Sequence, residues 1–200
     1  MSAKRELKID KTENPKRSFI NIGLIYQRLT DRQIDLWSSC AKDLKSKSIS
    51  NRKYIKSGRQ LFYYINMNLQ IIGEPIKLEP PRFDYPQYIT NIKISYINKK
   101  GKQDIRLLFD PEINKDTRII LSATRPLNKG KRYIDNSWFR QIAIIGDEFK
   151  SGCSVLAKYL MVYNYLEEDF YKISFKYREV NRISGISNME KQIVMYKEPE

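Results

Sequence analysis

The side chains best suited to chemistry in this sequence are the cations that crowd into positions 42–59. Seven of them fall within this stretch, opposed by Asp43 alone: Lys42, Lys45, Lys47, Arg52, Lys53, Lys56 and Arg59. We call them the basic run. Ammonium and guanidinium groups at this density neutralise phosphates or carboxylates, so the run predicts an anionic partner, either nucleic acid or an acidic protein face. The alternative is an ordinary solvated surface, which is favoured because Tyr54 is the only interleaved aromatic residue on which a base could stack.

Tyrosine is the second residue type that suggests a function, with 14 copies in 200 positions. Its large apolar ring and hydroxyl group suit surfaces that become interfaces. Strands of a β-sandwich account for Tyr171 and Tyr177, but five others gather near the expected helices and the proline-rich segment after them: Tyr54, Tyr63, Tyr64, Tyr85 and Tyr88. This tyrosine cluster is the predicted docking surface for another protein.

Catalytic and metal-binding chemistry is poorly represented. The chain has no histidine, so it cannot build a histidine-dependent hydrolytic triad, an imidazole acid–base pair or a histidine-containing zinc site. The acids at positions 167–169 are consecutive and alternate faces on a loop or strand, so they do not converge on one point. The sequences at 146–148 and 150–152 lack phosphate-loop spacing and predict turns. We therefore predict a protein that is not an enzyme and that uses no cofactor or metal.

The length and composition describe a globular chain of one large domain or two small ones, 200 residues with 41% hydrophobic side chains. The net charge of +14 is concentrated early, with 17 basic and 8 acidic residues up to Arg82 against 20 and 15 beyond it. Residues 1–17 lack the apolar core of a signal peptide, and no apolar stretch approaches the ~20 residues of a membrane span. Cys40 and Cys153 are predicted to stay reduced, in a protein made in a cytoplasm.

Helical signals dominate the first part of the chain. Thr30 and Gln33 have the spacing of a capping box, and the apolar residues after them recur with a helical period through Trp37 to Leu44. Ser57 and Gln60 form a second capping box, followed by an apolar stripe that ends at Gly73, a typical helix-terminating glycine. Residues 19–29 predict a shorter helix. Trp37, like Trp138 further along, is expected to pack in a core.

The pattern changes after residue 73. Four prolines between positions 75 and 86 predict a stiff linker, because proline is excluded from helix interiors and central strands. Beyond it the apolar residues alternate with a period of two, which predicts strands near 89–96, 105–109, 118–124, 138–145, 170–177 and 192–196. Residues 154–164 fit a helix or a strand. Short strands separated by turns predict an antiparallel sandwich.

Several motifs resemble a family of small phage- and prophage-associated proteins of Bacteroidetes-type bacteria. The first part of the resemblance is a capped helix with a downstream tryptophan, then a Ser-Gly-x-x-Leu-Phe helix before a double proline: Leu29 to Gln33, Trp37, Ser57 to Phe62, Ile65 to Leu69, Gly73 and Pro80-Pro81. Here Asp31 stands where the family pattern has proline. The second part looks like the family's fibronectin type III-like β domain: Ala123 to Leu127, Gly130-Lys131, Phe139-Arg140, Ile142 and Asp169 to Ile173.

The resemblance implies a non-enzymatic structural protein of a phage or phage-derived particle. The expected fold class is α+β, with a two-to-three-helix module followed by a fibronectin type III- or Ig-like antiparallel sandwich. The expected organisation is a polar tail at 1–17, a helical module at 18–73, a linker at 74–87 and a β domain at 88–200. We expect a capsid- or tail-associated accessory component of the virion, made in the bacterial cytoplasm. Its partners are expected to be other virion subunits, with no membrane and no small-molecule substrate; the alternative is nucleic-acid binding through the basic run.

Overall fold

The computed structural model of the chain describes residues 22–46, 57–82, 84, 86–89, 91–99, 102–131, 133–166 and 170–197. Contacts divide the chain into two compact units. A helical unit comprises Met1–Gln70 and Pro75–Pro80, and a β unit comprises Ile71–Glu74 and Pro81–Glu200. The chain is therefore an α+β protein, as predicted, and each unit is described by itself below.

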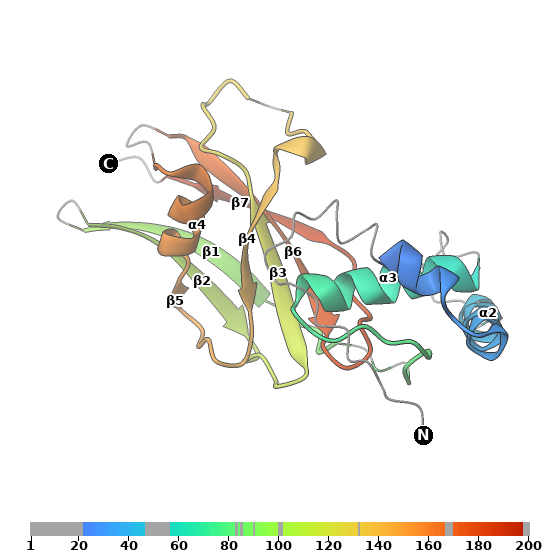
Figure 1. Cartoon of the computed structure of the whole chain (residues 1–200). Coiled ribbons are helices and arrows are strands. Elements are labelled where there is room, and N and C mark those ends of the chain that lie inside the picture. The colour runs from blue at the N-terminus through green and yellow to red at the C-terminus, as the bar shows by residue number, and fades with distance from the viewer. Residues whose placement is uncertain are drawn as a thin grey trace. The chain divides into compact units, whose positions relative to one another are not determined.

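The helical unit contains a helical segment at 22–27, helix α2 (Asp31–Ser46) and helix α3 (Gly58–Ile71) (Figure 1). The capping box before α2 is confirmed, because Thr30 Oγ1 accepts from the Gln33 backbone N–H at 3.3 Å and Gln33 Oε1 accepts from the Thr30 N–H at 2.9 Å. Ser57 Oγ likewise accepts from the Gln60 N–H at 3.3 Å. Local side chains thus satisfy amide groups that the first helical turn leaves without intrahelical partners.

Aromatic rings form the centre of the helical unit. The buried ring of Phe62 on α3 lies edge-on to Trp37 of α2 and to Tyr26 of the first helical segment, with centroids 5.2 Å apart in both pairs. The two long helices approach closely at Gly58, where a Cβ atom would lie 2.5 Å from the backbone nitrogen of Ser38. Only glycine fits this crossing without displacing backbone.

The proline-rich segment predicted as a linker is instead divided between the units. Residues 75–80 pack on the helical unit, since Trp37 Nε1–H donates to Leu78 O at 2.9 Å and the Asn66 amide exchanges two hydrogen bonds with the Lys77 backbone. Residues from Pro81 onward belong to the β unit, where the Gln87 backbone N–H donates to Thr117 Oγ1 at 3.0 Å. Hydrogen bonds to its backbone therefore hold each part of this segment in its own unit, although its proline content predicted a separate linker.

The β unit contains two antiparallel sheets (Figure 1). The three-stranded sheet has the order β1-β2-β5 and the four-stranded sheet the order β4-β3-β6-β7. Their bounds are β1 Asn91–Lys99, β2 Lys102–Asp110, β3 Thr117–Ala123, β4 Arg140–Ile145, β5 Cys153–Ser154, β6 Lys172–Asn181 and β7 Lys191–Tyr196. A hairpin joins β1 to β2, and β3 is paired on both sides, with β4 and with β6.

One hydrophobic core draws residues from both sheets, an arrangement compatible with a β-sandwich. Alternate residues face it, such as Ile105, Leu107 and Phe109 on β2, in the period of two that the sequence predicted. Helix α4 (Leu156–Tyr163) contacts β4 and β2, and its buried Tyr159 hydroxyl donates to the Thr124 carbonyl at 3.1 Å. The ambiguous stretch at 154–164 is therefore mainly helical.

The predicted strands differ from the observed ones mostly at their ends. A 3-10 turn, η1 (Asn136–Trp138), precedes β4, so the strand begins after Trp138 rather than at it. Strand β6 continues four residues past the predicted end at 177, to Asn181. The two-residue strand β5 was not predicted, because so short a strand has no periodicity of its own.

Candidate docking surfaces

The predicted tyrosine cluster is distributed over both units. Tyr63 and Tyr64 are half-buried on α3, whereas Tyr88 belongs to the β unit and is 60% exposed. Tyr54 and Tyr85 lie outside the described residues. The described members therefore do not form a single surface within one unit.

One member of the cluster and one of the basic run do meet in the helical unit. Arg59 and Tyr63 are one turn apart on α3, and the Arg59 guanidinium carbon lies 5.6 Å from the Tyr63 ring centroid and 5.8 Å from that of Tyr26. The two rings are 6.3 Å apart and tilted by 38°. Each such cation–π contact at an exposed site contributes about 0.5–1 kcal/mol. The exposed guanidinium is thus held above two half-buried rings, and we call these three residues the Arg59 platform.

Gly23 supports the platform from the first helical segment. A Cβ atom at this position would lie 2.8 Å from the Tyr63 hydroxyl oxygen. The absent side chain lets that hydroxyl rest close to the helix backbone, and a larger residue would push the Tyr63 ring out of place.

The basic run itself is described only in part. Lys42 and Arg59 are exposed, the side chain of Lys45 is not described, and Lys47, Arg52, Lys53 and Lys56 lie outside the described residues. Among the described side chains of the helical unit, five cations are nearly balanced by four acids: Arg28, Arg32, Lys42, Arg59 and Lys77 against Asp31, Asp35, Asp43 and Glu79. The described charges of this unit therefore do not by themselves form a strongly basic face.

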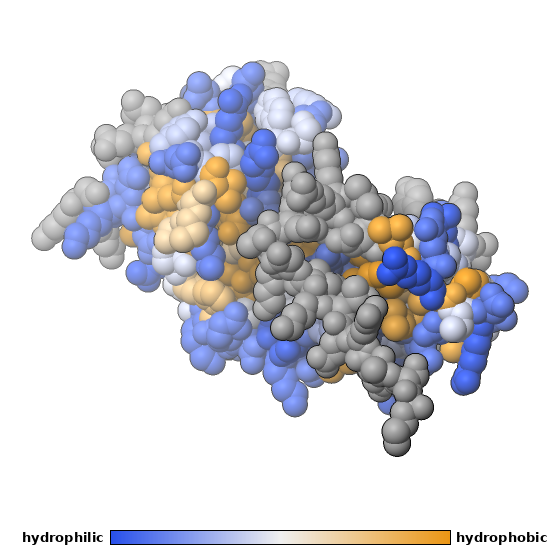
Figure 2. All heavy atoms as spheres, viewed as in Figure 1, coloured by the Kyte–Doolittle hydropathy of each residue, from blue (hydrophilic) through white to orange (hydrophobic). Residues whose placement is uncertain are grey.

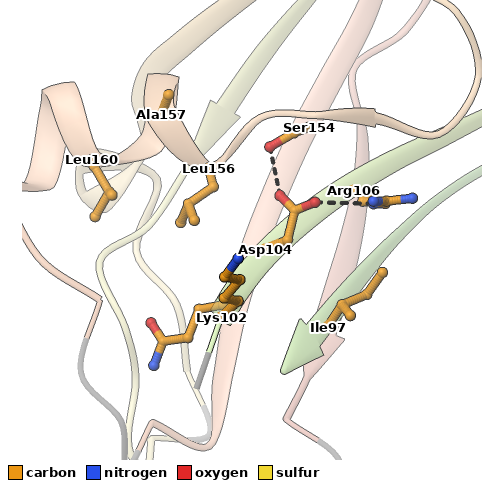
Figure 3. A pocket seen from close by; sticks show the side chains of 9 residues that line it. Ile97, Lys102, Asp104, Arg106, Ser154, Leu156, Ala157 and Leu160 are labelled. Atoms are coloured by element: carbon orange, nitrogen blue, oxygen red, sulfur yellow. Dashed lines mark hydrogen bonds and ion pairs between the residues drawn. The ribbon is translucent and has the colours of Figure 1, made fainter. Parts of the chain in front are cut away.

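A cleft in the β unit was not predicted. It encloses about 500 Å³ where α4 meets the hairpin of β1 and β2, and is lined by Ile97, Lys102, Gln103, Asp104, Arg106, Ser154, Leu156, Ala157 and Leu160. Figure 3 shows the apolar residues of α4 on one side and the charged residues of β2 on the other. Hydrophobic side chains also gather on the surface around α4 in Figure 2, consistent with the 81% exposure of Met161.

Asp104 is the polar centre of this cleft. Its carboxylate accepts hydrogen bonds from Ser154 Oγ at 2.5 Å and from Arg106 Nε at 2.9 Å (Figure 3). Burial acts to raise the pKa of Asp104, but the hydrogen bonds and the guanidinium charge outweigh it and hold the pKa below its ordinary value. An ionised carboxylate already bound to two donors is a weak base, so the arrangement orders the cleft wall and does not activate Ser154 for catalysis.

A buried ion pair is the other unpredicted polar feature of the β unit. The Glu179 side chain is fully buried, and its Oε1 lies 3.6 Å from Lys191 Nζ. Lys191 Nζ is also 4.1 Å from the ring centroid of Tyr88. Burial acts to lower the pKa of Lys191, but the Glu179 carboxylate, Tyr177 and Tyr88 together outweigh it, so that the pKa is raised. The pair joins β6, β7 and the segment before β1, which is a structural role.

Other sequence-level candidates have simple outcomes. Trp37 is fully buried, as predicted, but Trp138 is only half-buried beneath Lys131, whose Nζ lies 5.9 Å from the ring centroid. Trp138 sits in the exposed turn η1 rather than on a strand, so the prediction of a core position was wrong. Cys40 and Cys153 are half-buried free thiols, and burial raises the pKa of both. The acids at 167–169 lie outside the described residues.

The described residues contain no group of three or more acidic or cysteine side chains that could hold a metal ion. None of the helices in this part of the chain is long and apolar enough to cross a bilayer. Comparison with known proteins found no family model, no curated protein and no solved structure that matches this chain.

Proposed function

We propose that this protein is a non-enzymatic structural component of a phage or phage-derived particle. In this proposal it is a capsid- or tail-associated accessory protein that docks on a neighbouring virion subunit through its helical unit, while the β unit projects or bridges. It is made in the cytoplasm of the bacterial host. The sequence motifs described above supply the particle context, and the surface of the helical unit supplies the mechanism.

The Arg59 platform is the observation that carries the docking proposal. Arginine and tyrosine are among the residues that most often dominate binding energy at protein interfaces. Here an exposed guanidinium is already positioned over the rings of Tyr26 and Tyr63, 5.8 and 5.6 Å from their centroids. Because these contacts restrict the guanidinium before binding, less conformational freedom is lost when it meets an acidic group on a partner.

We further propose that the β unit is a fibronectin type III-like sandwich, and strand order supports this. Three strands, in the order β1-β2-β5, face four in the order β4-β3-β6-β7. In an Ig constant-type sandwich the fourth strand joins the sheet of the first, second and fifth strands. Here β4 instead pairs with β3, which favours the fibronectin-like alternative, with α4 inserted between β5 and β6.

The experiment is quantitative mass spectrometry of gradient-purified particles, with the copy number of this chain measured against the major shell protein. The wild-type chain is expected at a fixed, substantial ratio. The variant Arg59→Glu should lower that ratio about tenfold or more, because a hot-spot residue is worth at least about 2 kcal/mol. The variant Lys93→Glu reverses an exposed charge of the β unit and is the matched control, expected at the wild-type ratio.

Absence of the wild-type chain from clean particles would overturn the particle role. Equal ratios for the two charge-reversal variants would overturn docking through the Arg59 platform and leave the particle role standing. Nucleic-acid binding through the basic run stays a prediction, because only Lys42 and Arg59 of its seven side chains are described.

A further inference from the structure

A second surface of basic and aromatic side chains lies at one end of the β unit. It is formed by the described residues of the connection from β3 to β4, 124–131 and 133–139, which is the yellow trace at the top of Figure 1, and by the neighbouring ends of β6 and β7. The Leu127 N–H donates to Lys172 O at 2.9 Å, and the Tyr171 N–H donates to Leu127 O at 3.0 Å. Lys176 Nζ donates to Asn136 Oδ1 at 2.5 Å. These hydrogen bonds make the connection and the strand ends one continuous surface.

The charge of this surface is positive among the described side chains. It carries six cations: Arg125, Lys129, Lys131, Lys172, Lys176 and Lys197. Its two acids are both engaged within the unit. Asp135 accepts from the Ser137 N–H at 2.7 Å, and Glu190 Oε1 lies 3.1 Å from Lys176 Nζ. Lys176 is already engaged by Glu190 and Asn136, so the charge offered to an external anion rests on Arg125, Lys129, Lys131 and Lys172.

Exposed aromatic rings accompany these cations. Tyr133 is 76% exposed, Tyr196 is 53% exposed and Tyr171 is 37% exposed. The rings of Tyr171 and Tyr196 meet edge to face with centroids 5.5 Å apart. Trp138 adds a half-buried ring next to Lys131. This interleaving of rings and cations is what the basic run lacked in the sequence.

We propose that this surface, which we call the β-unit end surface, binds single-stranded nucleic acid. Lysine and arginine side chains would contact phosphates, and the exposed tyrosine rings would stack on unpaired bases. A duplex offers the same phosphates but keeps its base faces within the stack, so the exposed rings favour a single strand. The site uses no residue of the Arg59 platform, and either proposal can fail without the other.

The test is fluorescence anisotropy of the full chain with a labelled thymidine oligonucleotide of about 20 nucleotides, between about 50 and 200 mM salt. We expect affinity to fall with salt, by about 0.7 in the log–log slope for each phosphate neutralised. The variant Lys172→Glu should make that slope shallower. Lys93→Glu is the matched control for the loss of positive charge, expected to change it less.

Tyrosine variants separate stacking from simple charge attraction. Tyr133→Ala removes the most exposed ring of the surface and should weaken binding about tenfold with the salt slope unchanged. Tyr165→Ala removes a ring of 48% exposure just after α4 and is the control, expected to bind as the wild type does. Circular dichroism verifies that each variant is folded. Because Tyr133 is so exposed, its loss leaves the core intact.

Four outcomes would overturn the proposal. They are no binding at about 50 mM salt, equal binding by Tyr133→Ala and the wild type, equal losses in a variant and its control, and tighter binding of a duplex than of the single strand. Poly-glutamate that competes as well as the thymidine oligonucleotide would instead identify the surface as a site for acidic protein.

Discussion

The helices of the helical unit begin at polar contacts between residues close in the sequence, whereas the β unit relies on polar contacts between residues far apart in it. In the helical unit, the side chains that begin α2 and α3 act over three residues, as Thr30 with Gln33 and Ser57 with Gln60 do. In the β unit, the polar contacts that fix the architecture span tens of residues, as Gln87 with Thr117 and Asp104 with Ser154 do. A helix that is stabilised by neighbouring residues can be recognised in the sequence. A hydrogen bond between residues far apart in the sequence fixes how the strands are arranged but leaves no local sequence pattern.

The largest expected effect would break the helical unit alone. The variant Gly58→Ala places a Cβ atom 2.5 Å from the backbone nitrogen of Ser38, so α2 and α3 must separate. We expect a loss of about 3 kcal/mol in the stability of that unit. Trp37 and Trp138 lie in different units, so fluorescence in a Trp138→Phe background follows the helical unit by itself.

The matched control for this variant is Gly130→Ala, because a Cβ atom there would meet nothing within 4 Å. Its melting temperature should stay within the error of the wild-type value. A Gly58→Ala protein whose Trp37 transition is unchanged would show that the helices do not cross as closely as described.

The second effect belongs to the β unit. The variant Lys191→Met leaves the buried Glu179 carboxylate without its ionic partner, and the cost is expected to be about 2 kcal/mol. This is below the range for fully buried pairs because the Lys191 side chain is partly exposed. Chemical unfolding followed by Trp138 fluorescence in a Trp37→Phe background measures it, and the double variant Lys191→Met/Glu179→Leu should recover part of the loss.

The same pair predicts a dependence on alkaline pH. The pKa of Lys191 is raised in the folded state, so its contribution is complete below the ordinary lysine pKa of about 10.4 and is lost as pH rises through the folded-state pKa. Burial also raises the pKa of the neighbouring Tyr177, which acts in the same direction. Lys191→Met should therefore reduce the loss of stability between about pH 10 and 12. If the free energy of unfolding of the variant falls over this range as steeply as that of the wild type, the prediction is contradicted.

Much of the fold could be predicted from the sequence where its determinants lie within a few residues of one another. Capping boxes, the helix-ending Gly73 with its positive φ of 78°, and alternation along β2 are visible within a few residues. The cleft and the buried pair were not predictable, because Asp104 meets Ser154 only through the pairing of β2 with β5. Likewise, Glu179 meets Lys191 only through the register of β6 with β7. The β-unit end surface was missed because its cations are spread over residues 125–197 and gather only when the strands pair.

A smaller effect tests a local contact of the helical unit, the Thr30 cap of α2. The variant Thr30→Ala removes the hydroxyl that accepts from the Gln33 N–H, and loss of such a cap costs about 1 kcal/mol. The Trp37 transition should shift while that of the β unit stays constant. Thr30→Ser keeps the acceptor and is the control; if it is as destabilised as Thr30→Ala, the hydroxyl is not the cause.

The smallest expected effect tests a long-range contact of the β unit, the one between Asp104 and Ser154. The pKa of Asp104 is lowered in the folded state, so its contribution is present above the ordinary aspartate pKa of about 3.9 and is lost as pH falls below it. Because this carboxylate is close to solvent, we expect Asp104→Asn to cost less than about 1 kcal/mol at neutral pH. The difference from the wild type should shrink as pH falls below about 3.9 and Asp104 becomes protonated, and acid titration of the β-unit melting temperature measures this. A difference that persists unchanged through that titration would mean that the charge of Asp104 is not what stabilises the cleft wall. The loss would then come from one of the two hydrogen bonds, because Ser154 and Arg106 donate to different oxygens of Asp104 and an asparagine side chain has only one acceptor oxygen.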